Sequence, residues 1–236
     1  MVNKDVYYRG IRARLPRVLD RIAAAAERSG RDPAEVRIVA VTKGHAACAV
    51  EAVAEAGLRD IGENRVDELE RKRAVLNDLA VNWHMIGHVQ RRKAGPAARL
   101  AGLVHSVDSL RLAEKLSRLG EAEGRRVTVL VQLNVSGEAT KGGFPEAEGL
   151  DAVATVAALG GLRVLGLMTM APFVADEAVL RSTFRKTRAV MEAAAGTPGV
   201  EGRELSMGMS NDYEIAVEEG STMVRLGTTL LGERPG

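Results

Sequence analysis

The chain has 236 residues, of which 46% are hydrophobic and only 3% are aromatic. Its 33 basic and 31 acidic residues leave a formal net charge of +2, so its overall charge does not favour a polyanionic partner or an anionic membrane surface. So few aromatic side chains also disfavour a platform on which bases would stack. We therefore expect neither nucleic acid nor a membrane among its partners.

The length suits one well-buried domain, which we expect to cover residues 1–236. Cys48 is the only cysteine, so no intramolecular disulfide can form, as is typical of a reducing compartment. Charged residues interrupt every apolar stretch before it could cross a bilayer, and the N-terminus lacks the apolar core of a signal peptide. These features predict a cytoplasmic protein.

The first predicted element is an amphipathic helix. Apolar residues recur at helical spacing from Val6 to Ile22, and Ser29 with Gly30 ends the pattern, so we expect residues 1–30 to form a helix that packs on the rest of the domain. Beyond it, eight short apolar runs alternate with longer helical stretches. The runs cover residues 36–42, 58–62, 83–87, 103–107, 127–134, 164–169, 204–207 and 223–226.

The alternation of runs and helical stretches predicts an α/β fold. The helical stretches cover residues 46–56, 66–79, 109–121, 145–158, 176–194 and 212–218. Strands that alternate with helices pair in parallel through right-handed crossovers, and eight such units close a single (β/α)8 TIM barrel. Only residues 227–236 follow the last run, too few for a normal final helix, so the N-terminal helix is expected to fill that place.

Lys43 is the most informative residue at the predicted barrel mouth, where the strands end and functional residues gather. It directly follows the first apolar run. Partial desolvation there favours the neutral amine, which is the nucleophile that condenses with an aldehyde. The alternative is a lysine at a strand end whose ammonium group reaches solvent, and position alone does not decide between the two.

The last two runs are followed by residues that suit a phosphate. Ser210 opens a helical stretch, and Gly227 with Thr228 follows the final run. Backbone N–H groups at a helix N-terminus or glycine turn, aided by hydroxyl groups, bind anions, and barrels often place such a site after strands 7 and 8. The alternative is that residues 210–212 form an ordinary helix N-cap.

Arg225 lies within the last run, where a buried guanidinium needs an acceptor. An unprotonated pyridine nitrogen would serve, and because arginine does not give up its proton, the ring would remain a weak electron sink. The alternative is a salt bridge to Glu63 or another carboxylate at the mouth. We predict no metal site, because His84 and His88 lie on a strand leading into a turn, and no catalytic thiol at Cys48.

Seven sequence blocks follow one another along the chain. They are residues 39–43; 61–64 with Glu68; 84–90 with Lys93; 105–109; 134–138 with Lys141 and Gly143; 166–170; and a last block comprising 205–210, Asp212, 220–222 and 224–228. In these blocks the sequence resembles the pyridoxal phosphate homeostasis proteins, also called the YggS or PROSC family, over nearly its whole length. Gly44 departs from the pattern, because many relatives carry threonine there, and His88 stands where relatives often have an apolar residue.

The resemblance implies a fold similar to the N-terminal barrel domain of alanine racemase and a specific cofactor site. It implies that Lys43 holds pyridoxal 5'-phosphate as an aldimine and that Asn64 lines the cofactor. It further implies that Ser210, Gly227 and Thr228 hold the phosphate. Arg225 would then face the pyridine nitrogen.

The resemblance also bears on function. Racemases and decarboxylases with a similar barrel add a second domain and a partner subunit that supply a tyrosine acid/base, whereas the only tyrosines here, Tyr7, Tyr8 and Tyr213, lie in predicted helices. We therefore expect a non-catalytic protein of vitamin B6 and amino-acid homeostasis, a monomer or weak homodimer, with apo forms of pyridoxal phosphate enzymes as possible partners. A weak amino-acid racemase and a cofactor-free interaction protein are the alternatives.

Overall fold

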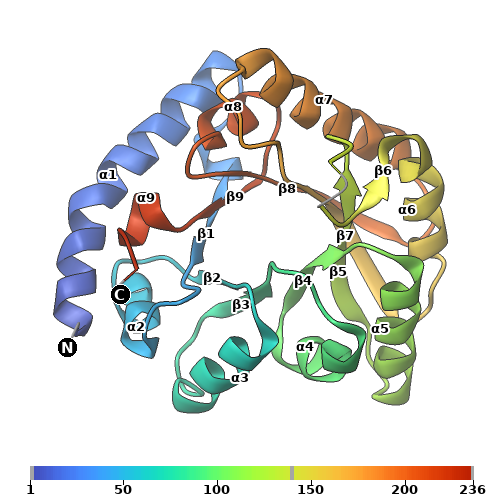
Figure 1. Cartoon of the computed structure of the whole chain (residues 1–236), viewed down its shortest axis with the longest axis horizontal. Coiled ribbons are helices and arrows are strands. Elements are labelled where there is room, and N and C mark those ends of the chain that lie inside the picture. Colours follow the sequence, from blue (N-terminus) through green and yellow to red (C-terminus); the bar gives the residue numbers. More distant parts are fainter. Residues whose placement is uncertain (1–2, 139–140, 235–236) are drawn as a thin grey trace.

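The computed structural model describes residues 3–138 and 141–234, and eight parallel strands form a closed barrel within them (Figure 1). Neighbouring strands pair in order around the ring, β1 pairs with β9, and β4 pairs with β5, which closes it. The barrel strands are β1 Arg37–Val41, β2 Asp60–Glu63, β3 Asn82–Met85, β4 Leu103–Val107, β5 Val127–Asn134, β7 Leu162–Thr169, β8 Val200–Met209 and β9 Met223–Leu226. The predicted TIM barrel is confirmed.

Helices surround the barrel, as Figure 1 shows. They are α2 Ala47–Glu55, α3 Val66–Val75, α4 Ala94–Leu100, α5 Leu110–Ala122, α6 Gly149–Ala157, α7 Glu177–Ala194, α8 Tyr213–Glu218 and α9 Thr228–Leu231. A two-residue strand, β6 Phe144–Pro145, pairs with the end of β5. α4 is not among the predicted helices, because Gly95 and Pro96 hide its helical pattern; both stand in its first turn, where proline is tolerated.

The N-terminal helix α1 Lys4–Arg28 packs against α2, α8 and α9. Asn3 caps it by accepting a hydrogen bond from the backbone N–H of Val6, and its buried face includes Ile11, Val18 and Ile22. The final helix α9 has only four residues, and α1 lies beside it (Figure 1).

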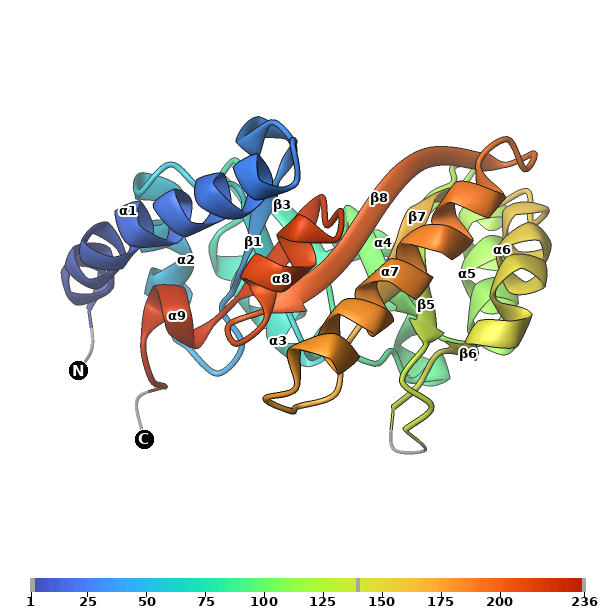
Figure 2. The ribbon, with the colours of Figure 1, turned by 90° about the horizontal axis from the view of Figure 1, so that it is seen from above.

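Buried side chains form two apolar clusters, of which the smaller draws on strand positions such as Val39, Leu130, Met168 and Met223. Several polar side chains are buried with them, and these set up the site described below: His84, His105, Thr169, Ser206 and Arg225. Figure 2 shows the segments that follow β5 and β7 projecting from the same side of the barrel. In the described part of the chain, no helix combines the length and apolar character needed to cross a membrane.

Candidate functional site at the barrel mouth

Lys43 lies two residues beyond the end of β1 and is half-buried. It lines an open cavity of about 740 Å³ together with Asn64, which follows β2. Asn64 approaches Gly87 so closely that a Cβ on Gly87 would stand 2.2 Å from the backbone oxygen of Asn64. The absence of a side chain at position 87 is therefore what lets the loop carrying Asn64 lie beside the loop that follows β3.

A buried ionic network lies beneath the loop that carries Lys43. Thr42 Oγ1 donates to Glu63 Oε1 at 2.5 Å, and Lys72 Nζ donates to the same oxygen at 2.7 Å. Lys72 also donates to the backbone oxygen of Thr42 at 2.7 Å and to Glu68 at 2.8 Å. Burial raises the pKa of Glu63, and Lys72 opposes the rise. The network fixes the end of β1, and therefore the position of the Lys43 backbone.

Gly44 extends this network to the loop itself. Its N–H donates to Glu68 Oε1 at 2.7 Å, and its φ of 75° lies in the left-handed region that favours glycine. A Cβ at Gly44 would stand 2.7 Å from Cδ of Arg234. The departure from threonine noted in the sequence thus coincides with a backbone conformation and a neighbour that both disfavour a side chain.

The structure brings together the three residues predicted to hold phosphate. The backbone N–H of Thr229, in the first turn of α9, lies 3.4 Å from Ser210 Oγ, so Ser210 stands at the N-terminus of the helix that Gly227 caps and Thr228 begins. The side chain of Asp212 accepts from the N–H of Met209 instead of capping α8. Asp212 nevertheless stands at the N-cap position of α8, so the N-cap interpretation holds for its position although its side chain makes no capping hydrogen bond.

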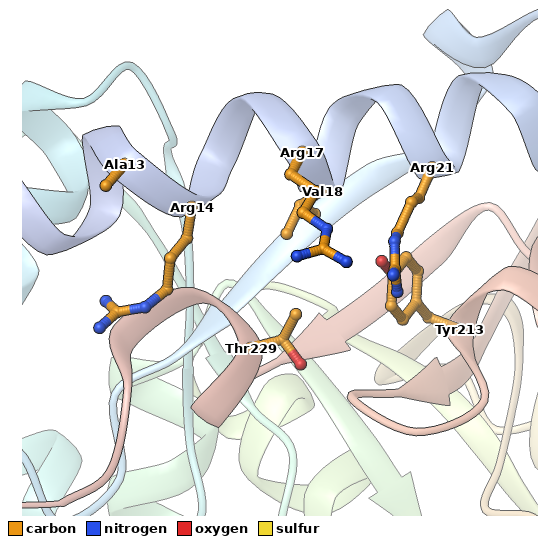
Figure 3. Close-up of a pocket in the computed structure, with 7 residues that line it drawn as sticks. All are labelled: Ala13, Arg14, Arg17, Val18, Arg21, Tyr213 and Thr229. Carbon is orange, nitrogen blue, oxygen red and sulfur yellow. The ribbon is translucent and has the colours of Figure 1, made fainter.

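Three arginines of α1 lie next to this group (Figure 3). Arg14, Arg17 and Arg21 line a cavity of about 460 Å³ with Thr229, and the Arg17 guanidinium points from α1 toward Thr229. Arg21 is paired with Glu214 at 3.1 Å. These cations add positive potential on the α1 side of Ser210 and Thr228, which favours an anion there.

Arg225 is buried, with 4% of its surface exposed, and its hydrogen bonds go to uncharged oxygens. One Nη donates to the backbone oxygen and the hydroxyl of Ser206 at 2.6 and 2.7 Å, and the other donates to the backbone oxygen of Thr169 at 2.9 Å. Burial lowers the pKa of Arg225 to about 10, a shift that Asp212 partly opposes. The alternative salt bridge to Glu63 is not formed, because Glu63 is engaged by Lys72 and Thr42.

The predicted residues therefore gather at one end of the barrel, on neighbouring strands. β1 and β9 pair directly, and a Cβ on Gly227 would stand 3.6 Å from the backbone oxygen of Val41, two residues before Lys43. The cavity beside Lys43 is nevertheless lined by the loops after β1 and β2, and not by Ser210, Gly227 or Thr228. Lys72 is a site residue that was not predicted, and its only signal in the sequence is its position four residues after Glu68 on one helix face.

Comparison with known proteins places this barrel in a family. The model of the family described as alanine racemase, N-terminal domain, matches residues 14–235. A pyridoxal phosphate homeostasis protein of Pseudomonas aeruginosa is 43% identical over 221 residues, covering 93% of this chain and 94% of that protein. The chain therefore belongs to the family of pyridoxal phosphate homeostasis proteins.

Solved structures agree with this assignment. The crystal structure of an unknown protein from Bifidobacterium adolescentis matches with a TM-score of 0.90 and 38% identity, covering 98% of this chain and 97% of that one. PipY of Synechococcus elongatus PCC7942, solved with PLP bound, matches with a TM-score of 0.78 and 36% identity, covering 88% of this chain and 100% of that one. The shared fold extends over nearly the whole chain.

Proposed function

We propose that this protein binds pyridoxal 5'-phosphate at the barrel mouth and handles the cofactor in vitamin B6 and amino-acid homeostasis, without substantial catalysis. In this proposal Lys43 holds the cofactor covalently as an aldimine, and Asn64 lines it. Ser210, Gly227 and Thr228 bind the phosphate. The names of the relatives and the PLP-bound structure of PipY support this function.

The observation that carries the proposal is the environment of Arg225. It is a buried cation at the mouth whose hydrogen bonds, among the described residues, go to uncharged oxygens of Ser206 and Thr169. A guanidinium has five N–H donors, so it can still donate to a neutral acceptor such as a pyridine nitrogen. When bound, the cofactor ring would serve as an electron sink for an attached amino acid, but a ring nitrogen held by arginine would stay unprotonated and withdraw electrons weakly.

The placement of the tyrosines supports a non-catalytic role. Tyr8 lies on α1, and Tyr213 begins α8 with its ring beside Arg21 (Figure 3). Tyr7 is buried, with its hydroxyl 3.1 Å from His45 Nδ1. None of the three lines the cavity beside Lys43, where an acid/base group opposite the lysine would be needed for proton transfer.

The test is to incubate the purified protein with pyridoxal 5'-phosphate, reduce it with borohydride and map the modified peptide by mass spectrometry. We expect a single modified residue, Lys43, and loss of the adduct in Lys43→Ala. Lys115→Ala, which changes a lysine on α5 on the outside of the barrel, serves as the matched control and should retain the adduct. An adduct on a different lysine, or none, would contradict the proposal.

Weak amino-acid racemisation is a second candidate, because one histidine adjoins the lysine. His45 lines the same cavity as Lys43. Burial, followed by the nearby Lys72 and Arg234, lowers the pKa of His45, so its imidazole is neutral near neutral pH and able to accept a proton. If chiral chromatography detects turnover that His45→Phe abolishes while the Lys43 adduct persists, the non-catalytic reading fails.

The proposal also covers the compartment, oligomeric state and partners of the protein. We place it in the cytoplasm, as a monomer or weak homodimer that passes cofactor to apo forms of pyridoxal phosphate enzymes. Mixing the loaded protein with such an apo-enzyme and following the gain of enzyme activity tests the transfer. No gain above that given by an equal amount of free cofactor would remove this partner from the proposal.

A further inference from the structure

A continuous row of hydrogen-bonded side chains crosses the barrel interior and ends at Arg225. Asp60 Oδ1 lies 2.9 Å from His84 Nε2, and His84 Nδ1 lies 2.8 Å from His105 Nε2. His105 Nδ1 lies 2.8 Å from Ser206 Oγ, which accepts from Arg225 at 2.7 Å. Asp60 is the first residue of β2, at the end of the strand opposite the mouth, so the row runs through the barrel.

The two ends of the row favour one direction for the hydrogen bonds between them. Arginine can only donate, and an ionised carboxylate can only accept. Ser206 accepts from Arg225, which leaves its own O–H able to donate to His105 Nδ1. When it does, a neutral His105 carries its proton on Nε2 and donates to His84 Nδ1, and His84 in turn donates from Nε2 to Asp60. In this arrangement one proton occupies each link and every polar atom of the row has a partner.

The charges around the row agree with this arrangement. Burial, followed by His84, Arg225 and Arg37, lowers the pKa of His105 well below its usual value. Burial of Asp60 alone would raise the pKa of that carboxyl, but hydrogen bonds from His84 and Asn82 bring it below its usual value. Near neutral pH, therefore, Asp60 is ionised and His105 is uncharged, as the row of donors and acceptors requires.

Charged side chains of the other strands that lie near the row are paired within the described residues. Arg37 on β1 is paired with Glu204 on β8 at 2.6 Å. β5 carries no titratable side chain, and Arg163 on β7 is paired with Glu201 at 3.0 Å. Asp212 lies close enough to Arg225 to influence the pKa of the guanidinium without forming an ion pair with it. The protonation state of the row therefore depends chiefly on Asp60, the two histidines and Arg225.

We propose that Asp60, His84, His105 and Ser206 are positioning residues that hold Arg225 as a hydrogen-bond donor toward the bound cofactor and couple cofactor binding to the protonation of the histidine pair. This inference rests on the proposed binding of pyridoxal phosphate. A further proton on either histidine puts two donors at one link. The hydrogen bonds of the row must then break or reverse their direction. In the reversed row, Ser206 accepts from both His105 and Arg225, and its own O–H loses its acceptor.

The direct test needs no cofactor. Long-range nitrogen–proton NMR correlation of protein labelled at histidine reports the charge and tautomer of each imidazole. Near neutral pH we expect His105 to be neutral with its proton on Nε2, donating to an unprotonated Nδ1 of His84. A charged imidazole, or a proton on Nδ1, at either residue overturns the proposal.

The coupling is tested by adding pyridoxal 5'-phosphate to the same samples. We expect the His105 ring-nitrogen shifts to move on binding in the unaltered protein and to stay fixed in Ser206→Ala, which cuts the row between His105 and Arg225. Ser206→Ala should also weaken cofactor binding about tenfold, since a hydrogen bond to a charged group is lost. Ser117→Ala, which removes a buried hydroxyl of α5 that bonds Glu121 and Gly161, is the control and should leave both readouts unchanged.

The outcomes separate this proposal from the proposed function. If the unaltered protein takes up no cofactor, the proposed function fails, whatever tautomers the histidines show. If it takes up cofactor on Lys43 but Ser206→Ala binds equally tightly and the His105 shifts still move, the proposed function stands and the positioning row is wrong. A merely structural role for Ser206 would lower stability without altering the histidine response to the cofactor.

Discussion

The two sides of the barrel mouth hold their buried cations in opposite ways. On the side of Lys43, the Lys72 ammonium is paired with Glu63 at 2.7 Å and with Glu68 at 2.8 Å. On the side of β7 to β9, which adjoins β1, the hydrogen bonds of Arg225 go to the uncharged oxygens of Ser206 and Thr169. The first arrangement compensates its charges and stabilises the loop of Lys43, whereas the second leaves a charged donor available to a ligand. The ion-paired Lys72 thus serves stability, whereas Arg225 is available for binding.

The largest expected effect is the loss of stability when the ion pair of Lys72 with Glu63 is broken. Lys72→Met leaves the buried Glu63 carboxylate without its cation, so we expect a loss of about 3–5 kcal/mol in the free energy of unfolding, measured by urea denaturation. Adding Glu63→Gln should recover part of the loss, because the uncompensated charge is then removed. Lys93→Met, which breaks an exposed pair with Asp67, should leave the free energy nearly unchanged. Equal losses in the free energy of unfolding for Lys72→Met and Lys93→Met would contradict the stabilising role of the buried pair.

Arg225→Met should affect cofactor binding more than stability. The substitution removes a desolvated charge along with its hydrogen bonds, so we expect the stability of the cofactor-free protein to fall by less than about 2 kcal/mol. The affinity for pyridoxal phosphate should fall at least about tenfold, since a charged hydrogen bond to the ring is lost. Urea denaturation and absorbance titration measure the two quantities. A loss of stability as large as that of Lys72→Met would erase the distinction between the two sides.

A third prediction concerns pH. The folded-state pKa of His105 lies below its unfolded value, so the folded protein binds fewer protons and the stabilising contribution is complete above the unfolded pKa of about 6.5. It is lost as pH falls from there toward the folded pKa, at no more than about 1.4 kcal/mol per pH unit for one group. Urea denaturation at a series of pH values should show this slope. It should become shallower in His105→Asn, where His45 with its lowered pKa still contributes, and persist in His88→Gln, which changes an exposed histidine.

The smallest effect is expected at the loop of Lys43. Gly44→Ala places a side chain in the left-handed region and against Arg234, so we expect a loss of about 1 kcal/mol. Gly30→Ala has a similar φ of 68° with nothing within 4 Å of the added Cβ, so it isolates the backbone strain. A thermal or urea unfolding series distinguishes the two. If Gly44→Ala costs less than Gly30→Ala, the Arg234 contact does not constrain the loop.

The sequence identified most of the residues that meet at the mouth. Polar residues after parallel strands come together at one edge of a barrel, so Lys43, Asn64, Ser210 and Gly227 could be named from their positions after apolar runs. The helix α4 was missed, because local propensity is weak wherever glycine and proline stand in the first turn. Assignments from local pattern succeed where burial and periodicity agree.

By itself, the sequence determined the barrel, since eight apolar runs alternating with helices have few other ways to bury their surface. It also determined which residues stand at strand ends. Only the tertiary structure decided the partners: that Lys72 pairs with Glu63 nine residues away, and that His105 bonds Ser206 across 101 positions. Such contacts depend on strand stagger and side-chain direction around a closed ring, and these are properties of the whole fold that no local stretch of sequence specifies.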